Sequence, residues 1–312
     1  MHAIESSPSV ASKLVSFLTL MRPFTWLWFT ILPMSVGYLL LDPEPVQYWR
    51  YLAFVAAVVL ADSAATTLND VFDADTDGLS IESDRRHRPI VAGEISPREA
   101  IAFACLLMGS GLGLAFLAGR NTVIGLAAAL VLALAYSVPP LRLNARPWAS
   151  QPFWLVLFSV GVATIGMMAR SFFTIEALVY CLSVGAFMGV GETLAKDIRD
   201  WDNDAKAGKR TSVVVLGPGR AALLSRGAAF VGTTAFMGFL WLVADVALWA
   251  RLLCTGLLLF WAGRVFELTH RLHKGYDKAA GAALHKGYIR VYLAVNVALL
   301  GGMVDRAQDA FF

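Results

Sequence analysis

Long apolar runs recur along this chain of 312 residues and constrain its fold more than any other feature. A hydrocarbon core about 30 Å thick needs roughly 20 apolar residues for each helical span. The sequence supplies nine such runs, at 24–41, 50–69, 99–118, 122–138, 152–169, 174–195, 220–243, 247–266 and 289–305. With 57% hydrophobic and 16% charged residues, too little polar surface remains for a soluble domain. The runs therefore predict an integral, multi-pass membrane protein.

These runs are expected to be helical, because they are long, unbroken and rich in Leu and Ala. A transmembrane β-barrel would instead show short segments in which apolar and polar residues alternate. No linker is long enough to separate two soluble domains, so we expect a single transmembrane domain over residues 1–312. Residues 1–12 lack the features of a signal peptide, and we expect a short flexible tail there. The predicted fold class is an all-α bundle of nine transmembrane helices.

Basic residues gather in every second connection between the predicted spans. Of the 26 Lys and Arg residues, 21 fall on one side of the membrane in this arrangement. The five on the other side are Arg50, Arg120, Arg170, Arg251 and Arg306. Because basic connections are retained in the cytoplasm, the N-terminus is predicted to be cytoplasmic. An odd number of spans then places the C-terminus on the opposite side.

Aspartates cluster at the cytoplasmic end of two predicted spans. Polar residues at steps of 4, 3, 4 and 4 form a first ladder along one face of the second span, with Asp62, Thr66, Asn69, Asp73 and Asp77. Asp70 lies beside this face, at the same mouth of the span. Steps of 3 and 4 form a second ladder that extends the sixth span, with Asp197, Asp200 and Asp204. Both ladders are expected to lie on the cytoplasmic side.

Carboxylates at this spacing repel one another unless cations bind them. Oxygen ligands without His or Cys nearby suit Mg²⁺, which commonly bridges carboxylates to substrate phosphates. Basic side chains able to contact phosphate follow or flank the ladders, namely Arg85, Arg86, Arg88, Lys196, Arg199, Lys209 and Arg210. Taken alone, such basic residues are more often solvated faces and topology signals. Two acidic ladders on one side of the membrane favour a diphosphate held by metal.

Four short motifs follow one another along most of the chain. They are Asn69-Asp70-Val71-Phe72-Asp73-Ala74-Asp75-Thr76-Asp77, then Arg88-Pro89-Ile90 with Gly93, then Tyr136-Ser137-Val138-Pro139-Pro140-Leu141-Arg142-Leu143, and finally Lys196-Asp197-Ile198-Arg199-Asp200 running through Asp204 to Gly208-Lys209-Arg210-Thr211. In this order they resemble the motifs of the UbiA superfamily of intramembrane prenyltransferases. Asn144 departs from the pattern, because many relatives have a basic residue there, and this weakens the expectation that its loop binds phosphate.

The resemblance implies a central cavity under a cytoplasmic cap made by the two acidic loops. A polyprenyl diphosphate would place its head between the ladders and its tail in an apolar tunnel open to membrane lipid. Two Mg²⁺ ions are implied, one held by Asn69, Asp70, Asp73 and Asp77 and the other by Asp197, Asp200 and Asp204. The implied substrate contacts are Asn69, Arg88, Arg142, Lys196 and Lys209. Asp73 and Asp200 would act as catalytic residues within these sets.

Ionisation of an allylic C–O bond gives a diphosphate and an allyl cation, and metal and basic residues stabilise the first. The ring of Tyr136 could stabilise the cation, although Tyr also anchors spans at the water interface. Asp62 lies outside the motif, and either contacts the acceptor or pairs with a polar neighbour. Glu192 is expected to pair with Lys196, one turn further along the helix.

The sequence as a whole predicts Mg²⁺-dependent transfer of a prenyl group to a small acceptor, with an aromatic one favoured. No nucleic-acid partner is expected. One alternative is a terpene cyclase that acts on the prenyl diphosphate alone. A more remote alternative is a cation-coupled transporter, which would require polar residues through the depth of several spans, whereas most acidic residues here lie at one face. Acceptor identity and prenyl chain length are left open.

Overall fold

A computed structural model describes residues 10–25, 30–40, 47–78, 87–158 and 175–309, and every regular element in these ranges is a helix. The α-helices are α1 (Val10–Leu20), α2 (Pro23–Thr25), α3 (Leu32–Leu40), α4 (Tyr48–Gly78), α6 (Pro97–Ala118), α7 (Arg120–Ser137), α8 (Ser150–Val156), α10 (Ile175–Val184), α11 (Thr193–Lys206), α12 (Ser212–Leu216), α13 (Pro218–Gly238), α14 (Leu248–Lys274) and α15 (Lys278–Asp309). A 3₁₀ turn, η2 (Leu143–Ala145), and two π-helical segments, η4 (Gly185–Glu192) and η5 (Phe239–Val243), complete the set. The predicted all-α fold class is confirmed.

Within the described ranges, seven helices are long and apolar enough to cross a membrane. Each corresponds to one of the predicted apolar runs. The first and fifth predicted spans, 24–41 and 152–169, include residues outside the described ranges, so the count of nine stays a prediction. Several helices extend beyond the predicted apolar runs, and α4 continues past its run as far as Gly78. The residues of the first ladder, whose spacing predicted a helix, therefore lie on one continuous helix.

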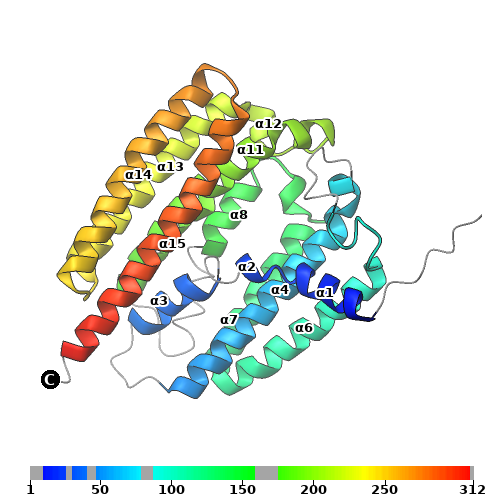
Figure 1. Ribbon diagram of the computed structural model, residues 1–312, viewed down its shortest axis with the longest axis horizontal. Coiled ribbons are helices and arrows are strands. Elements are labelled where there is room, and N and C mark those ends of the chain that lie inside the picture. Colours follow the sequence, from blue (N-terminus) through cyan, green and yellow to red (C-terminus); the bar gives the residue numbers. More distant parts are fainter. Residues whose placement is uncertain (1–9, 26–29, 41–46, 79–86, 159–174, 310–312) are drawn as a thin grey trace, which may run out of the picture.

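Two groups of helices stand on either side of a central element (Figure 1). α13, α14 and α15 pack in sequence on one side, and α4, α6 and α7 pack together on the other. Between them, η4 packs against α8 and α13, while α11 packs against α13 and α15. The continuous segment Leu178–Lys206, which contains η4 and α11, is also the most buried of the candidate spans. The second acidic ladder is therefore carried by the central element of the bundle.

Close helix packing fixes the position of this central element. A Cβ atom at Gly232 of α13 would lie 2.8 Å from the backbone nitrogen of Phe187, and one at Gly191 would lie 2.7 Å from the hydroxyl of Tyr288. The rings of Phe187 and Tyr288 pack edge to face, with centroids 5.0 Å apart. Since a π-helix has wider turns than an α-helix and is common at functional sites, η4 sets the register of the aspartates that follow it.

The connections between helices lie at two opposite ends of the bundle. Near one end, Gly219 at the start of α13 lies close to Leu272 of α14. The turn into α15 is closed by Asp277, whose pKa is lowered by a hydrogen bond from the Ala280 amide and by the Arg271 guanidinium. The C-terminal end of α15 lies at the other end of the bundle (Figure 1), where Trp249 donates a hydrogen bond to Asp305. The end with Asp277 is also the one toward which both acidic ladders point.

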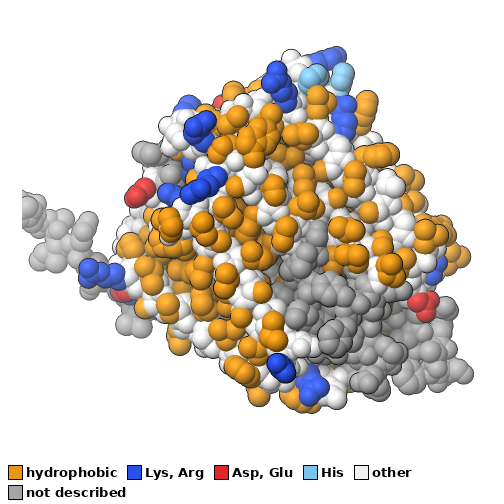
Figure 2. All heavy atoms as spheres, turned by 180° about the vertical axis from the view of Figure 1, so that it is seen from behind, with side chains coloured by type: hydrophobic (Ala, Val, Ile, Leu, Met, Phe, Trp, Pro, Cys, Tyr) orange, Lys and Arg blue, Asp and Glu red, His pale blue; other side chains and the backbone are white. Residues whose placement is uncertain are grey.

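The outer surface is largely apolar. Figure 2 shows hydrophobic side chains spread across the face seen from behind, with most Lys and Arg side chains at its margins. Exposed large side chains occur on several of the candidate spans, for example Leu106, Phe116, Phe230, Leu242 and Phe260. Such a surface would be costly in water but suits contact with lipid. The molecule is an integral, multi-pass membrane protein.

Candidate active site

A cavity of about 550 Å³ lies between α4 and α11. Both ladders line it, with Asp62, Thr66, Asn69, Asp73 and Asp77 from α4 and Asp197, Asp200 and Asp204 from α11. Five basic side chains share the lining, namely Arg22, Arg88, Lys196, Arg199 and Lys209. Two acidic ladders far apart in the sequence therefore face one space together with basic groups. This is the juxtaposition that the sequence predicts.

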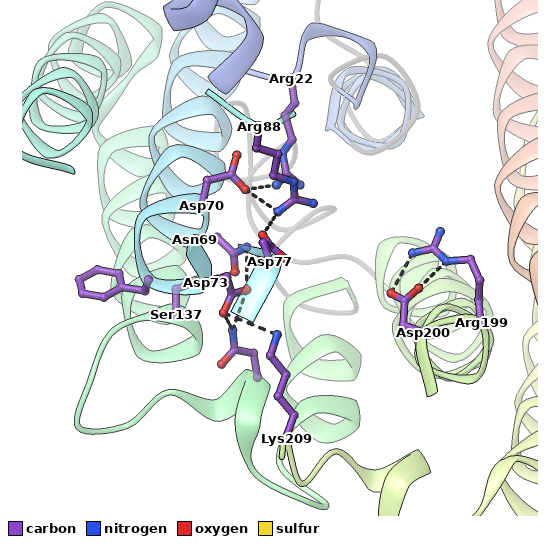
Figure 3. Close-up of polar contacts among 12 residues, drawn as sticks. Arg22, Asn69, Asp70, Asp73, Asp77, Arg88, Ser137, Arg199, Asp200 and Lys209 are labelled. Atoms are coloured by element: carbon purple, nitrogen blue, oxygen red, sulfur yellow. Dashed lines mark hydrogen bonds and ion pairs between the residues drawn. The ribbon is translucent and has the colours of Figure 1, made fainter. Parts of the chain in front are cut away.

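Arginines hold two carboxylates of the first ladder. Arg88 donates to Asp70 Oδ1 at 2.9 Å and also to Asp77, while Arg22 donates to Asp70 (Figure 3). Asp70 and Asp77 are both buried. Asp70 is not part of the cavity lining, in contrast to Asp77 and both arginines. Asp70 therefore orients Arg22 and Arg88 from behind the cavity wall.

Asp73 is the point where two of the helix connections meet the first ladder. It accepts hydrogen bonds from Asn69 at 3.2 Å, from Arg142 at 3.3 Å and from Asn144 at 3.4 Å. Lys209, in the connection between α11 and α12, lies 3.8 Å from the same carboxylate (Figure 3). Residues after α7 and after α11 are thereby tied to α4. A rearrangement at Asp73 would therefore change the contacts of both connections.

The amide of Asn69 has a fixed orientation. Ser137, the last residue of α7, donates to Asn69 Oδ1 at 3.1 Å, and the Asn69 amide nitrogen donates to Asp73. Arg142 also donates to the carbonyl of Phe72 at 2.8 Å, and it is absent from the cavity lining in the described residues. The structure thus places Arg142 as a support of Asp73, while Arg88, Lys196 and Lys209 reach the cavity.

The second ladder is held by neighbours on other elements. Asp197 accepts from Gln151 of α8 at 3.2 Å, and Gln151 accepts from Ser212 of α12 at 2.5 Å. Arg199 forms a two-point ion pair with Asp200, at 2.7 Å and 2.9 Å. These carboxylates and Asp204 are buried with respect to the outer surface and open onto the cavity. Bonds to fixed partners restrict the carboxylate orientations.

A further pair supports Arg199 from α15. His285 Nδ1 lies 3.1 Å from an Arg199 nitrogen, and His285 Nε2 lies 2.9 Å from Glu192. Glu192 acts on Lys196 through its charge, in line with the expectation, and α15 also brings His285 against Glu192. Four-residue spacing allowed the pair with Lys196, but it could not reveal a partner 93 residues away.

An aromatic wall completes the cavity. Tyr136 stacks on Phe153 with a centroid distance of 4.8 Å and meets Trp154 edge to face at 5.0 Å. All three rings line the cavity. Tyr136 is thus a cavity residue rather than an anchor at the outer surface. Its role in stabilising a cation stays a prediction.

Some residues that line the cavity or support its carboxylates could not be identified from the sequence. Arg22, Gln151 and His285 carry no spacing signal, because they reach the site from elements that contact it only in three dimensions. Asn144 stood out only as a departure from the family motif, yet it contacts Asp73 and lines the cavity. Ser137 lies within the third motif and was therefore named from the sequence. Its hydrogen bond to Asn69 could not be predicted from the motif.

The donor set of this cavity suits magnesium. Among the described residues, no three acidic, His or Cys side chains lie close enough together to hold a metal ion unaided. Mg²⁺ does not require such a cage, because it takes one or two protein carboxylates and completes its shell with phosphate oxygens and water. The cavity offers carboxylates from two helices together with cationic groups for phosphate. These residues fit a metal–diphosphate pair better than a bare metal site.

The fold and the cavity define a multi-pass membrane protein with acidic and basic side chains around one cavity, and comparison with known proteins gives the family. Residues 30–286 match the UbiA prenyltransferase family. The chain belongs to this family. A solved UbiA homologue from Archaeoglobus fulgidus, described as bound to GPP and Mg²⁺, superposes with a TM-score of 0.68 at 18% identity, covering 92% of this chain and 99% of that one. The predicted family is confirmed.

Curated relatives with different named activities are similar to this chain. Digeranylgeranylglyceryl phosphate synthase of Methanoculleus marisnigri is 32% identical over 189 residues, which cover 58% of this chain and 62% of the relative. A 4-hydroxybenzoate octaprenyltransferase of Polaromonas is 29% identical over 203 residues, covering 63% and 66%. The chain thus matches less than two thirds of the length of each relative. Their names differ in the acceptor, so similarity alone does not select one.

Proposed function

We propose that this protein transfers a prenyl group from a polyprenyl diphosphate to a small acceptor in a Mg²⁺-dependent reaction. The observation that carries the proposal is the single cavity lined by both acidic ladders and by five basic side chains. An anion such as diphosphate is stable there only with cations to balance the carboxylates. The named ligands of the solved Archaeoglobus homologue, GPP and Mg²⁺, support this combination.

The diphosphate head is held by residues from both ladders. Asn69, Asp73 and Asp77 on α4 would bind one ion and Asp197, Asp200 and Asp204 on α11 a second, all of them cavity residues. Asp70, the remaining member of the predicted metal set, acts through Arg22 and Arg88 instead. Bound Mg²⁺ supplies positive charge that stabilises the leaving diphosphate. Arg88, Lys196 and Lys209 add donors to the phosphate oxygens.

Bond cleavage separates charge, and the cavity suits both products. As the C1–O bond of the prenyl diphosphate breaks, its electron pair leaves with the diphosphate, where Arg88 and Lys196 stabilise it. The allyl cation then faces a wall of Tyr136, Phe153 and Trp154, whose ring faces are attracted to positive charge. A nucleophilic atom of the acceptor bonds to C1 and releases one proton. The products are the prenylated acceptor and diphosphate.

The aromatic wall favours an aromatic acceptor, because flat rings pack well against Tyr136 and its neighbours. The second candidate is terpene cyclisation, in which the same cation reacts within its own chain. The two functions share the cleavage step and differ in whether an acceptor is consumed. The transporter alternative is not favoured, since every acidic residue of the cavity lining lies either on α4 or on the continuous segment Leu178–Lys206, and the chain belongs to the UbiA prenyltransferase family.

The test incubates the purified full chain in detergent with geranyl, farnesyl or geranylgeranyl diphosphate and Mg²⁺. Each reaction is run with and without an acceptor panel of hydroquinones, 4-hydroxybenzoate and alkylglyceryl phosphates, and products are identified by mass spectrometry. We expect an adduct only when an acceptor is present, and none after chelation of Mg²⁺. A hydrocarbon or terpene alcohol formed without acceptor would replace the transferase with a cyclase.

A further inference from the structure

Asp62 brings an isolated carboxylate into the apolar part of the cavity. It lies on α4, on the face that carries Thr66, Asn69 and Asp73. Seven residues separate it from Asn69, which at 1.5 Å per residue is a rise of about 10 Å along the helix. Asp62 therefore lines the cavity well below the diphosphate-binding end.

The cavity lining around Asp62 is mainly apolar. Its helix neighbours Val58 and Ala61 line the cavity, as do Met34 of α3 and Leu126 and Leu130 of α7. The Asp62 side chain forms a hydrogen bond with Thr30. Its Oδ2 atom is buried and has no hydrogen-bond partner among the described residues. A buried oxygen without a donor is costly, so this position is suited to a group that brings a donor with it.

Only one of the two substrates can supply that donor. The prenyl tail is a hydrocarbon with no polar hydrogen, and the diphosphate is an anion held at the other end of the ladder. We propose that Asp62 forms the acceptor subsite and binds a hydroxyl group of the second substrate through Oδ2. This inference rests on the proposed function and adds the class of acceptor, which is a neutral compound with a hydroxyl donor.

The charge of Asp62 also sets what the subsite rejects. An acceptor with a carboxylate at the same point would place two anions together in apolar surroundings, which is unfavourable. Arg22 is a positive charge that acts on Asp62, and it is already engaged by Asp70. The subsite therefore discriminates against benzoate-type acceptors and accepts phenols and alcohols. Hydroquinone and 4-hydroxybenzoate differ in this one group and make a matched pair of probes.

The first measurement uses the wild-type protein alone. Hydroquinone and 4-hydroxybenzoate are tested as substrates and as competitive inhibitors of whichever acceptor in the panel is prenylated. We expect hydroquinone to bind about tenfold or more tightly than 4-hydroxybenzoate. Equal inhibition by the two probes would overturn the inference while leaving prenyl transfer in place. Absence of any adduct with every acceptor would refute the proposed function and the subsite together.

The second measurement uses Asp62→Asn, which keeps the shape of the side chain and adds an amide donor. We expect the KM for the acceptor to rise about tenfold or more, the KM for the prenyl diphosphate to stay within about twofold, and the discrimination between the probes to shrink. Thr67→Val is the matched control, since Thr67 is buried on the same helix, donates to the Ser63 carbonyl and does not line the cavity. An unchanged acceptor KM in Asp62→Asn would overturn the inference.

Discussion

Single carboxylates in this site differ in function according to what surrounds them. Asp73 and Asp200 open onto the cavity and are fixed by several donors, whereas Asp70 lies behind the wall and orients Arg22 and Arg88. All belong to motifs recognisable in the sequence. The family motif grouped Asp70 with the metal ligands, because a motif cannot distinguish a side chain facing the cavity from one facing a neighbouring arginine.

The clearest expectation at this scale concerns Asp73 and Asp200. Alanine at either position removes a carboxylate that faces the diphosphate end of the cavity, so turnover should fall about a hundredfold or more. Steady-state rates with saturating Mg²⁺ and prenyl diphosphate measure the effect. Asp75→Asn and Asp202→Asn are matched controls, because both residues lie on the same helices outside the cavity lining. Near-normal turnover in Asp73→Ala would remove it from the catalytic set.

Helical elements explain how two ladders far apart in the sequence come to face one another. The 3 and 4 residue steps predicted that α4 and α11 each carry their aspartates on one face, and the structure has both as continuous helix. The π-helical segment η4 was not predicted, since nothing in Gly185–Glu192 marks a change of helix type. Its position follows from tertiary packing, above all at Gly232 and Gly191, where only a hydrogen atom fits.

Packing at Gly232 leads to an expectation at the scale of elements. In Gly232→Ala the new methyl group would lie 2.8 Å from the backbone of Phe187, so α13 and η4 must separate. We expect a loss of about 1–3 kcal/mol of stability, seen as a lower Tm in detergent, together with reduced activity. Gly227→Ala on the same helix meets nothing within 4 Å and should keep or raise the Tm. Equal Tm values for the two variants would contradict the packing argument.

The whole molecule is a helix bundle whose candidate active site lies toward one end. That it is a membrane protein follows from the apolar content of the sequence alone. The family motifs named the acidic residues of the site in advance, but the contacts that Arg22, Gln151 and His285 make with motif residues depend on the assembled fold. Charge distribution also predicts which way the bundle faces the membrane. The end bearing the ladders is the one rich in Lys and Arg, which indicates the cytoplasm.

Orientation can be measured directly in cells. Single cysteines placed in the Gly275–Asp277 turn and after Arg306, in a background with Cys105, Cys181 and Cys254 replaced by Ala, are exposed to an impermeant maleimide. The turn should be protected in intact cells and labelled after permeabilisation, while the C-terminal site should be labelled in both. The reverse pattern would contradict the assignment and place the active site on the outer side.

The central claim is that both ladders hold one diphosphate through Mg²⁺. The most direct measurement is equilibrium binding of farnesyl S-thiolodiphosphate, which cannot readily ionise, to the purified protein as Mg²⁺ is varied. Binding should require Mg²⁺, and Asp73→Ala on α4 and Asp200→Ala on α11 should each weaken it, with Asp75→Asn unchanged. Tight binding without Mg²⁺, or full binding in Asp200→Ala, would contradict a diphosphate held jointly by the two helices.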